Sequence, residues 1–355
     1  MKFAKKTMEV KIFKDALIKI TSVIILFFFV LSAYSQDYKT VKAQQGDGIF
    51  SILRRNDLPP GEYQSKFIEL NKDKLGKNNT LIVGQTYKLP IKSAVAKAAE
   101  TKVNTEVKST KGPDFTIKLF GPSYQKVTVI DKKLSGAVFY LISGHGGPDP
   151  GATGRLNNAL LCEDEYAYDV TLRLARKLME HSATVYVIVQ DPKDGIRDES
   201  ILRSSKDEVC YGNLKIPKGQ TARLNQRKDI VNNLYNKHKD AYQRLIEIHV
   251  DSRSKGQNVD VFFYHAQNSK NGKKLATTFQ QVFREKYNQH QPDRGYKGTV
   301  SERNLHILRN SNMPAVYIEL GNIHHFRDQQ RFMIADNRQA LANWLTEGII
   351  RDYKK

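Results

Sequence analysis

Two hydrophobic patterns alternate along residues 114–355. Nearly continuous apolar runs are typical of strands covered on both faces, and they predict strands at 125–130, 137–143, 184–190, 244–250, 259–264, 304–308 and 315–320. Apolar positions at helical spacing predict helices at 163–180, 221–238, 272–287 and 336–352. This order favours an α/β domain whose twisted, mostly parallel sheet is flanked by helices on both faces. Residues 192–220 interrupt it with a long, polar, irregular insertion.

The chain ahead of this domain divides into three parts. Residues 91–113 are mainly Ala, Lys, Thr and Ser, which predicts a linker, flexible or partly helical. Residues 36–90 form a short module. Residues 1–35 combine a lysine-rich start, an apolar run at 23–31 and small residues at Ala33 and Ser35, which is typical of a secretory signal peptide. The run is shorter than the ~20 residues of a membrane span, which favours cleavage over anchoring.

The formal net charge of +20 at pH 7 stays strongly positive when this leader is removed. A basic protein suits nucleic acid, but export makes an anionic polymer of the cell envelope the better partner. We therefore expect no nucleic-acid partner and no stable membrane span after cleavage. The expected location is the periplasm or cell envelope, or the secreted fraction.

Chemically reactive side chains follow three of the predicted strands. His145 follows the 137–143 strand, while His249 and Glu319 lie near the ends of the 244–250 and 315–320 strands. In open α/β sheets, sites form outside the carboxyl ends of the strands. Glu163 begins the 163–180 helix on its apolar face, so it is expected to point toward this sheet edge. Glu165 is the rival carboxylate, but it lies off that face.

Two imidazoles and one carboxylate are the ligand set of hydrolytic zinc sites, and a further carboxylate then serves as general base. The glycines of GHGGPDPGATG would let the chain turn behind His145 and let a substrate approach. A histidine at a strand end is also a common surface residue, and the other seven histidines, including His324 and His325, are interpreted in this way. The loop lacks the GxGxxG spacing and the lysine of nucleotide-binding loops.

Four sequence blocks together resemble those of the zinc-dependent N-acetylmuramoyl-L-alanine amidases, a family of peptidoglycan hydrolases. In order, they are GHGGPDPGATG, CEDEYAYDVTLRLARKL, LIEIHVDS and LRNSNMPAVYIELGN. The resemblance implies zinc bound by His145, Glu163 and His249, with Glu319 as the catalytic residue. The chain departs from the usual pattern at three positions, which bear on substrate detail rather than on the metal: Gln190 for arginine, Asp251 for asparagine and Asn322 for an aromatic residue.

The short module resembles LysM, a glycan-binding fold of two strands and two helices. The resemblance rests on YKTVKAQQGDGIFSIL and LNKDKLGKNNTLIVGQTYKLP, within residues 38–90. Gly48 replaces the common Thr and Phe50 the common Trp, so the resemblance implies the fold more directly than sugar affinity. A module that merely spaces the enzyme from the wall is the alternative.

These features predict an exported cell-wall hydrolase that cleaves the amide between N-acetylmuramic acid and L-alanine, with zinc-activated water and a glutamate base. Two alternatives stay open: a non-catalytic peptidoglycan-binding protein with a degenerate amidase domain, and a zinc peptidase that acts within the stem peptide. The expected partners are the glycan strands and stem peptides of peptidoglycan, and a protein activator is a candidate partner. The sequence identifies no substrate-binding residues.

The two cysteines supply a further hypothesis. Cys162 immediately precedes Glu163, and Cys210 lies in the insertion. Disulfides persist in exported proteins. A Cys162–Cys210 bridge would pin the insertion beside the zinc site, and the alternative is two separate buried thiols.

Overall fold

The computed structural model describes residues 38–354, apart from 45–46, 57, 59, 77–78, 92–113, 157, 252–257, 259 and 292–293. The predicted signal peptide and almost all of the predicted linker lie outside the described residues. Within the described part, no helix is both long and apolar enough to cross a bilayer.

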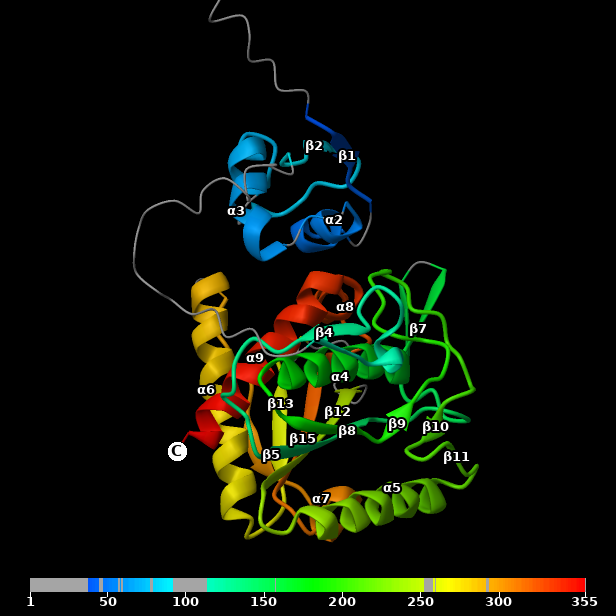
Figure 1. Cartoon of the computed structure of the whole chain (residues 1–355). Helices are drawn as coiled ribbons and strands as arrows, with labels where there is room; N and C mark the ends of the chain where they lie inside the picture. Colours follow the sequence, from blue (N-terminus) through cyan, green and yellow to red (C-terminus); the bar gives the residue numbers. More distant parts are fainter. Residues whose placement is uncertain are drawn as a thin grey trace, which may run out of the picture.

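A six-stranded sheet forms the centre of the larger domain (Figure 1). In spatial order its strands are β14 (Val300–Glu302), β13 (Phe262–His265), β15 (Ala315–Asn322), β12 (Tyr242–Asp251), β5 (Ala137–Ser143) and β8 (Thr184–Val187). Neighbouring strands run parallel except for β13 and β15. The predicted mostly parallel α/β sheet is confirmed.

Helices cover both faces of this sheet (Figure 1). On one face lie α4 (Glu163–Glu180), α6 (Lys270–His290), α8 (Phe326–Met333) and α9 (Ala335–Tyr353), and on the other α5 (Gln220–Tyr235) and α7 (His306–Asn310). All seven residues of β5 are buried, which explains its continuous apolar run. Phe139 and Leu141 face the α4 side, whereas Val138, Tyr140 and Ile142 face the α5 side.

Several short strands and turns sit around this frame. The strand β3 (Asp114–Thr116) pairs with β4 (Lys126–Thr128), and β6 (Thr153–Leu156) pairs with β7 (Ala159–Cys162). In the insertion, β10 (Val209–Cys210) pairs with β9 (Val189–Gln190) and β11 (Leu214–Lys215). Two 3₁₀ turns, η3 (Lys118–Phe120) and η4 (Asn236–His238), complete the set of named elements in this domain.

The N-terminal module has its own small core. Its elements are β1 (Thr40–Lys42), α2 (Ile49–Arg55), α3 (Pro60–Asn71) and β2 (Thr86–Lys88), and β1 pairs with β2 antiparallel. Ile52, Leu53, Phe67 and Tyr87 are fully buried in it. Two strands and two helices are the elements that the sequence led us to expect here.

Two predictions from local sequence were wrong. The 304–308 segment is not a strand, because β14 ends at Glu302 and α7 begins at His306. Ile307 and Leu308 are buried, and so short an apolar run does not distinguish a strand from a helical turn. The interpretation of seven surface histidines also fails, since His181 and His265 are buried. His181 places Nδ1 2.8 Å from Asp131 Oδ1, a contact that offsets its burial.

A buried ion network fixes the insertion to the helical layer. Asp169, Arg173 and Arg338 have fully buried side chains, and both guanidinium groups donate to Asp169 Oδ2, at 2.7 and 2.6 Å. Asp169 Oδ1 accepts from the backbone N–H of Arg197 in the insertion at 2.8 Å. Both arginines also donate to the Arg197 carbonyl, at 2.6 and 2.8 Å. The insertion is therefore held to α4 and α9 by charge-assisted hydrogen bonds.

Replacement of Asp169 by Asn should weaken both the fold and this attachment. Two guanidinium groups would stay buried without their carboxylate, so we expect the free energy of unfolding in urea to fall by about 3–5 kcal/mol. Limited proteolysis should then cut within 192–220 first. The matched control is Glu285→Gln, which removes a half-exposed partner of Arg351 and should cost less than about 1 kcal/mol. Equal stability of the two variants would contradict the role of Asp169.

Candidate metal centre

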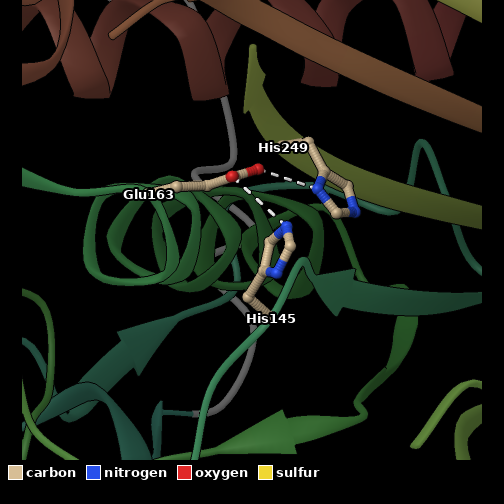
Figure 2. Close-up of side chains that lie close together, drawn as sticks. All are labelled: His145, Glu163 and His249. Carbon is tan, nitrogen blue, oxygen red and sulfur yellow. Dashed lines mark hydrogen bonds and ion pairs between the residues drawn. The ribbon is translucent and has the colours of Figure 1, made fainter. Parts of the chain in front are cut away.

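His145, Glu163 and His249 meet at the carboxyl edge of the sheet (Figure 2). They come from the loop after β5, the first residue of α4 and the end of β12. One donor atom from each lies within 4.8 Å of the other two. Glu163 lies between the imidazoles, with Oε2 3.2 Å from His145 Nε2 and Oε1 2.8 Å from His249 Nδ1. The structure thus brings together the three residues predicted as ligands.

The backbone holds both oxygens of the Glu163 carboxylate. The N–H of Ala152 donates to Oε2 at 2.7 Å, and the N–H of Val250 donates to Oε1 at 3.0 Å. Burial alone would raise the pKa of Glu163, but its hydrogen bonds and charge interactions with His145 and His249 hold that pKa well below its usual range. The carboxylate is therefore charged and fixed in position.

Each imidazole also has a carboxylate on its other nitrogen. His145 Nδ1 lies 3.0 Å from Asp149 Oδ2, and His249 Nε2 lies 3.4 Å from Glu247 Oε1. Burial disfavours the charged imidazoles, but the hydrogen bonds to Asp149, Glu163 and Glu247 outweigh it and raise the pKa to about 9 for His145 and about 10 for His249. Without a metal ion, both imidazole rings are therefore protonated on both nitrogens and positively charged at neutral pH. A metal ion that binds here must displace one proton from each ring.

Glu247 and Asp149 were missed by the sequence analysis. Glu247 lies two residues before His249, so both side chains project from the same face of β12. Asp149 lies within the GHGGPDPGATG block, four residues after His145. Tyr317 is a third missed residue, and its ring stacks on His249 with centroids 4.2 Å apart and planes 16° apart. The i and i+2 spacing on a strand could have signalled Glu247, but no local pattern signals Tyr317.

Glu319 lies beside this group rather than in it. On β15 it pairs in register with His249 on the parallel strand β12, so the two side chains project from the same face of the sheet. It is partly exposed. Glu165, which the sequence offered as the rival of Glu163 for the ligand position, instead forms an ion pair with Arg197 at 2.8 Å. The three candidate metal ligands therefore form one group, and the Glu319 carboxylate lies next to that group without belonging to it.

The departures from the expected pattern lie near this edge. Gln190 donates from its side-chain amide to the Val187 carbonyl at 3.0 Å. Asn322 is fully buried, and its Oδ1 accepts from the backbone N–H of His324 at 2.9 Å. The side chain of Asp251 lies outside the described residues.

Comparison with known proteins decides the family. A model of the N-acetylmuramoyl-L-alanine amidase family matches residues 140–351, which is more than half of the chain. The chain belongs to this amidase family. No curated protein gives a match to the sequence.

Solved structures of several amidases are similar to this one. The amidase AmiC2 of Nostoc punctiforme is 17% identical, with a TM-score of 0.44 over 62% of this chain and 99% of that chain. An N-acetylmuramoyl-L-alanine amidase from Clostridium difficile 630 is 24% identical, with a TM-score of 0.44 over 61% and 97%. The CwlD amidase of Clostridioides difficile, solved in complex with the GerS lipoprotein, is 20% identical, with a TM-score of 0.46 over 61% and 98%.

Two glycines of this amidase make room for the donor side chains themselves. A Cβ atom at Gly144 would lie 2.2 Å from Cε1 of His249, and one at Gly151 would lie 2.6 Å from Oε2 of Glu163. Gly151 also has a φ of 69°, which other residues rarely adopt. The glycine-rich sequence predicts chain turning and substrate approach, whereas in the structure close packing of the donor side chains requires these two glycines.

The hypothesis of a Cys162–Cys210 disulfide was wrong, because the two cysteines form no bond with each other. Both cysteines are free and buried. Cys210 Sγ donates to Gln226 Oε1 at 3.1 Å and packs on the α5 side of the sheet. Cys162 occupies the N-cap position of α4 and makes no side-chain capping hydrogen bond there. The Asp169 network holds the insertion instead, without a covalent link.

The substitution Gly144→Ala should disrupt the candidate metal centre while the fold persists. The new methyl group would overlap the His249 ring and push it away from Glu163. We expect loss of metal binding, measured as bound metal per chain, together with native-like circular dichroism. Gly219→Ala is the matched control, because a Cβ atom there meets nothing within 4 Å and the residue has a φ of −77°. Metal binding by Gly144→Ala equal to that of the control would refute this account.

Proposed function

We propose that this amidase is an exported zinc enzyme that hydrolyses the bond between the lactyl group of N-acetylmuramic acid and the L-alanine of the stem peptide. The observation that carries the proposal is the group of His145, Glu163 and His249, with Glu319 beside it, in a chain of this family. Peptidoglycan is the substrate class of the family.

The residues present fit a zinc ion. Two imidazole nitrogens and one carboxylate oxygen, all within 4.8 Å of one another, are a common zinc ligand set in hydrolases. A carboxylate on the far nitrogen of each imidazole, here Asp149 and Glu247, is the usual support of a zinc-binding histidine. Zinc, when bound, supplies Lewis acidity that polarises the amide carbonyl and favours deprotonation of water near neutral pH.

Glu319 is the residue that we assign to proton transfer. Its carboxylate accepts a proton from the attacking water and later gives a proton to the departing amine of L-alanine. The water oxygen bonds to the carbonyl carbon, and the carbon–nitrogen bond breaks. Register pairing with His249 supports this role, because it puts Glu319 next to the donors but leaves it outside the ligand set.

Two other functions fit less well. A degenerate, non-catalytic wall-binding protein would need none of these four residues, and the chain has them all. A zinc peptidase acting within the stem peptide would use the same ligand set. Membership of the amidase family favours the amide at muramic acid.

The rest of the chain supports action at the cell wall. We propose a signal peptide at 1–35, a LysM-like glycan-binding module at 36–90, a linker at 91–113 and a catalytic domain at 114–355. The strong positive charge suits anionic wall polymers rather than nucleic acid in an exported protein. A protein activator stays a candidate partner.

Digestion of purified peptidoglycan with site variants tests the proposal. The wild type should release stem peptides with a free L-alanine amino group, identified by mass spectrometry. His145→Ala and His249→Ala should lose zinc and activity together. Glu319→Gln should keep one zinc per chain but lose activity by at least about 100-fold, because it removes only the proton carrier.

The matched control is His324→Ala, since His324 is an exposed histidine near the same edge. It should keep both zinc and activity. Zinc loss in Glu319→Gln would overturn the assignment of Glu319. Fragments that keep L-alanine on muramic acid would instead identify a peptidase.

Deletion of residues 38–90 tests the proposed module. The truncated protein should bind insoluble wall material less tightly but cleave a soluble muropeptide at nearly the wild-type rate. Tethering raises the local concentration of enzyme without changing its chemistry. Co-sedimentation and a soluble-substrate assay measure the two effects. Equal sedimentation of both forms would show that the basic catalytic domain anchors the protein.

A further inference from the structure

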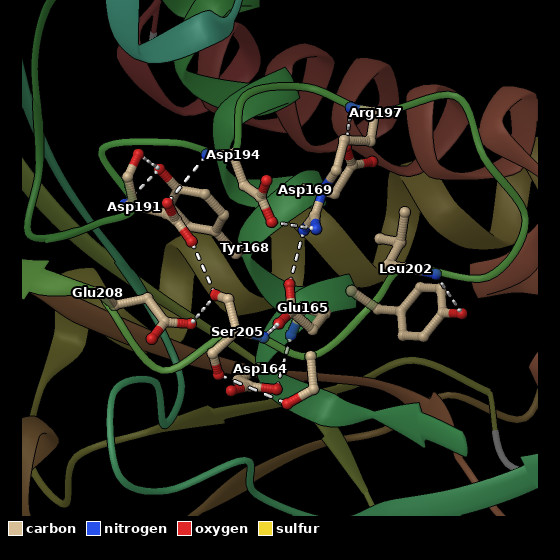
Figure 3. Close-up of polar contacts among 12 residues, drawn as sticks. Asp164, Glu165, Tyr168, Asp169, Asp191, Asp194, Arg197, Leu202, Ser205 and Glu208 are labelled. Carbon is tan, nitrogen blue, oxygen red and sulfur yellow. Dashed lines mark hydrogen bonds and ion pairs between the residues drawn. The ribbon is translucent and has the colours of Figure 1, made fainter. Parts of the chain in front are cut away.

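Asp164, Glu165 and Glu208 form a second group of carboxylates, separate from the candidate metal centre (Figure 3). Asp164 and Glu165 follow Glu163 on the first turn of α4, and Glu208 belongs to the insertion. One oxygen from each lies within 4.8 Å of the other two, and the three residues are 3%, 1% and 8% exposed. The proposed amidase mechanism uses none of these three residues.

The three carboxylates of this group outnumber the basic side chains that are paired with them. Among the residues that the structure describes, Arg197 is the one basic side chain paired with it, at 2.8 Å from Glu165 Oε2. Arg197 is shared with Asp194, which it contacts at 2.7 Å. Asp164 and Glu208 form no ion pair within the described part of the chain. Buried carboxylates that lack a counter-charge are costly, so the group favours either a bound proton or a further cation.

Most oxygens of the group accept a hydrogen bond, such as Glu165 Oε1 from the backbone N–H of Ser205 at 2.6 Å, but one oxygen has no donor. Asp164 Oδ1 accepts from the backbone N–H of Glu165 at 2.9 Å, but Asp164 Oδ2 is buried and accepts from no described group. The Ser205 hydroxyl lies 2.8 Å from Asp191 Oδ2 and 3.1 Å from Glu208 Oε1 (Figure 3). One hydroxyl has a single proton, so it serves only one of these carboxylates at a time. Acceptor capacity is therefore left over within the group.

We propose that Asp164, Glu165 and Glu208 bind a hard divalent cation, with Ca²⁺ preferred over Mg²⁺. Carboxylate oxygens without imidazole or thiolate select such ions over zinc. Ca²⁺ takes oxygen ligands at about 2.3–2.6 Å in flexible geometry, while Mg²⁺ needs a near-ideal octahedron at about 2.0–2.1 Å and gives up its waters reluctantly. The three residues are buried, which leaves little room for the several water ligands that Mg²⁺ usually keeps, whereas Ca²⁺ accepts several carboxylates in irregular geometry.

The cation would join the insertion to two of the three segments that carry the proposed zinc ligands. Glu208 Oε2 accepts from the backbone N–H of Gly147 at 2.8 Å, in the loop that follows His145. Asp164 directly follows Glu163 on α4. A bound cation therefore stabilises the insertion against both segments, which makes it a structural ion distinct from the catalytic metal. This inference goes beyond the proposed amidase activity and does not depend on it.

Thermal unfolding with Ca²⁺ or Mg²⁺ alone tests the site. The purified protein, its zinc content measured in parallel, should show a midpoint raised by about 5 °C at Ca²⁺ concentrations 100 times the dissociation constant, and by less with equal Mg²⁺. Equilibrium dialysis with radiolabelled calcium should find one ion per chain. Wild-type protein without a midpoint shift and without bound calcium would overturn the site.

Two variants and one control locate the ion. Asp164→Asn and Glu208→Gln should each reduce the calcium-dependent shift to below about 1 °C, while circular dichroism and zinc content stay unchanged. Glu208→Gln keeps an acceptor for the Gly147 N–H, so its loss of response reports charge rather than misfolding. Asp207→Asn removes the neighbouring carboxylate, which pairs with the exposed Lys193, and should respond as the wild type does. Calcium binding that persists in both site variants would disprove the assignment.

Discussion

The Glu163 carboxylate is the interaction on which the rest of the site depends. A buried carboxylate is costly unless positive charge and hydrogen-bond donors surround it. Glu163 has two backbone N–H donors, from Ala152 just before β6 and from Val250 near the end of β12, and it also contacts two imidazoles. The loop after β5, the end of β12 and the start of α4 must therefore converge at one point. In the metal-free protein, protons on the two imidazoles supply the positive charge that the Glu163 carboxylate needs. A metal ion bound at the same point would supply it instead.

The close packing of this point explains several otherwise unrelated sequence features. Gly144 and Gly151 are required because the His249 ring and the Glu163 carboxylate occupy the space of a Cβ atom. Tyr317 and Glu247 fix the plane and the far nitrogen of His249. Glu319 is one strand away and on the same face, which gives it access to the group without joining it.

The helix α4 links this centre to the rest of the domain. Its first turn directs Glu163 toward the imidazoles and Asp164 and Glu165 toward the insertion, and its N-terminal dipole favours this concentration of negative charge. Farther along the same helix, Asp169 and Arg173 form the buried network that holds the insertion. The insertion is thus attached by polar contacts at two levels of one helix, where a disulfide between Cys162 and Cys210 had been expected.

The sequence by itself determined the main strands and helices of the catalytic domain and the side chains that form the candidate metal centre. The apolar run of β5 and the periodic face of α4 gave the residue limits that the structure shows, because a doubly covered strand and a long amphipathic helix leave strong local patterns. The rule that sites form at the carboxyl ends of strands brought His145, His249 and Glu319 to one edge. Tertiary structure alone decided the conformation of 304–308, the free state of both cysteines, the stacking of Tyr317 on His249, and the position of Glu208 beside Asp164 and Glu165. These depend on which segments meet in space, and residues distant in sequence carry no local signal of that contact.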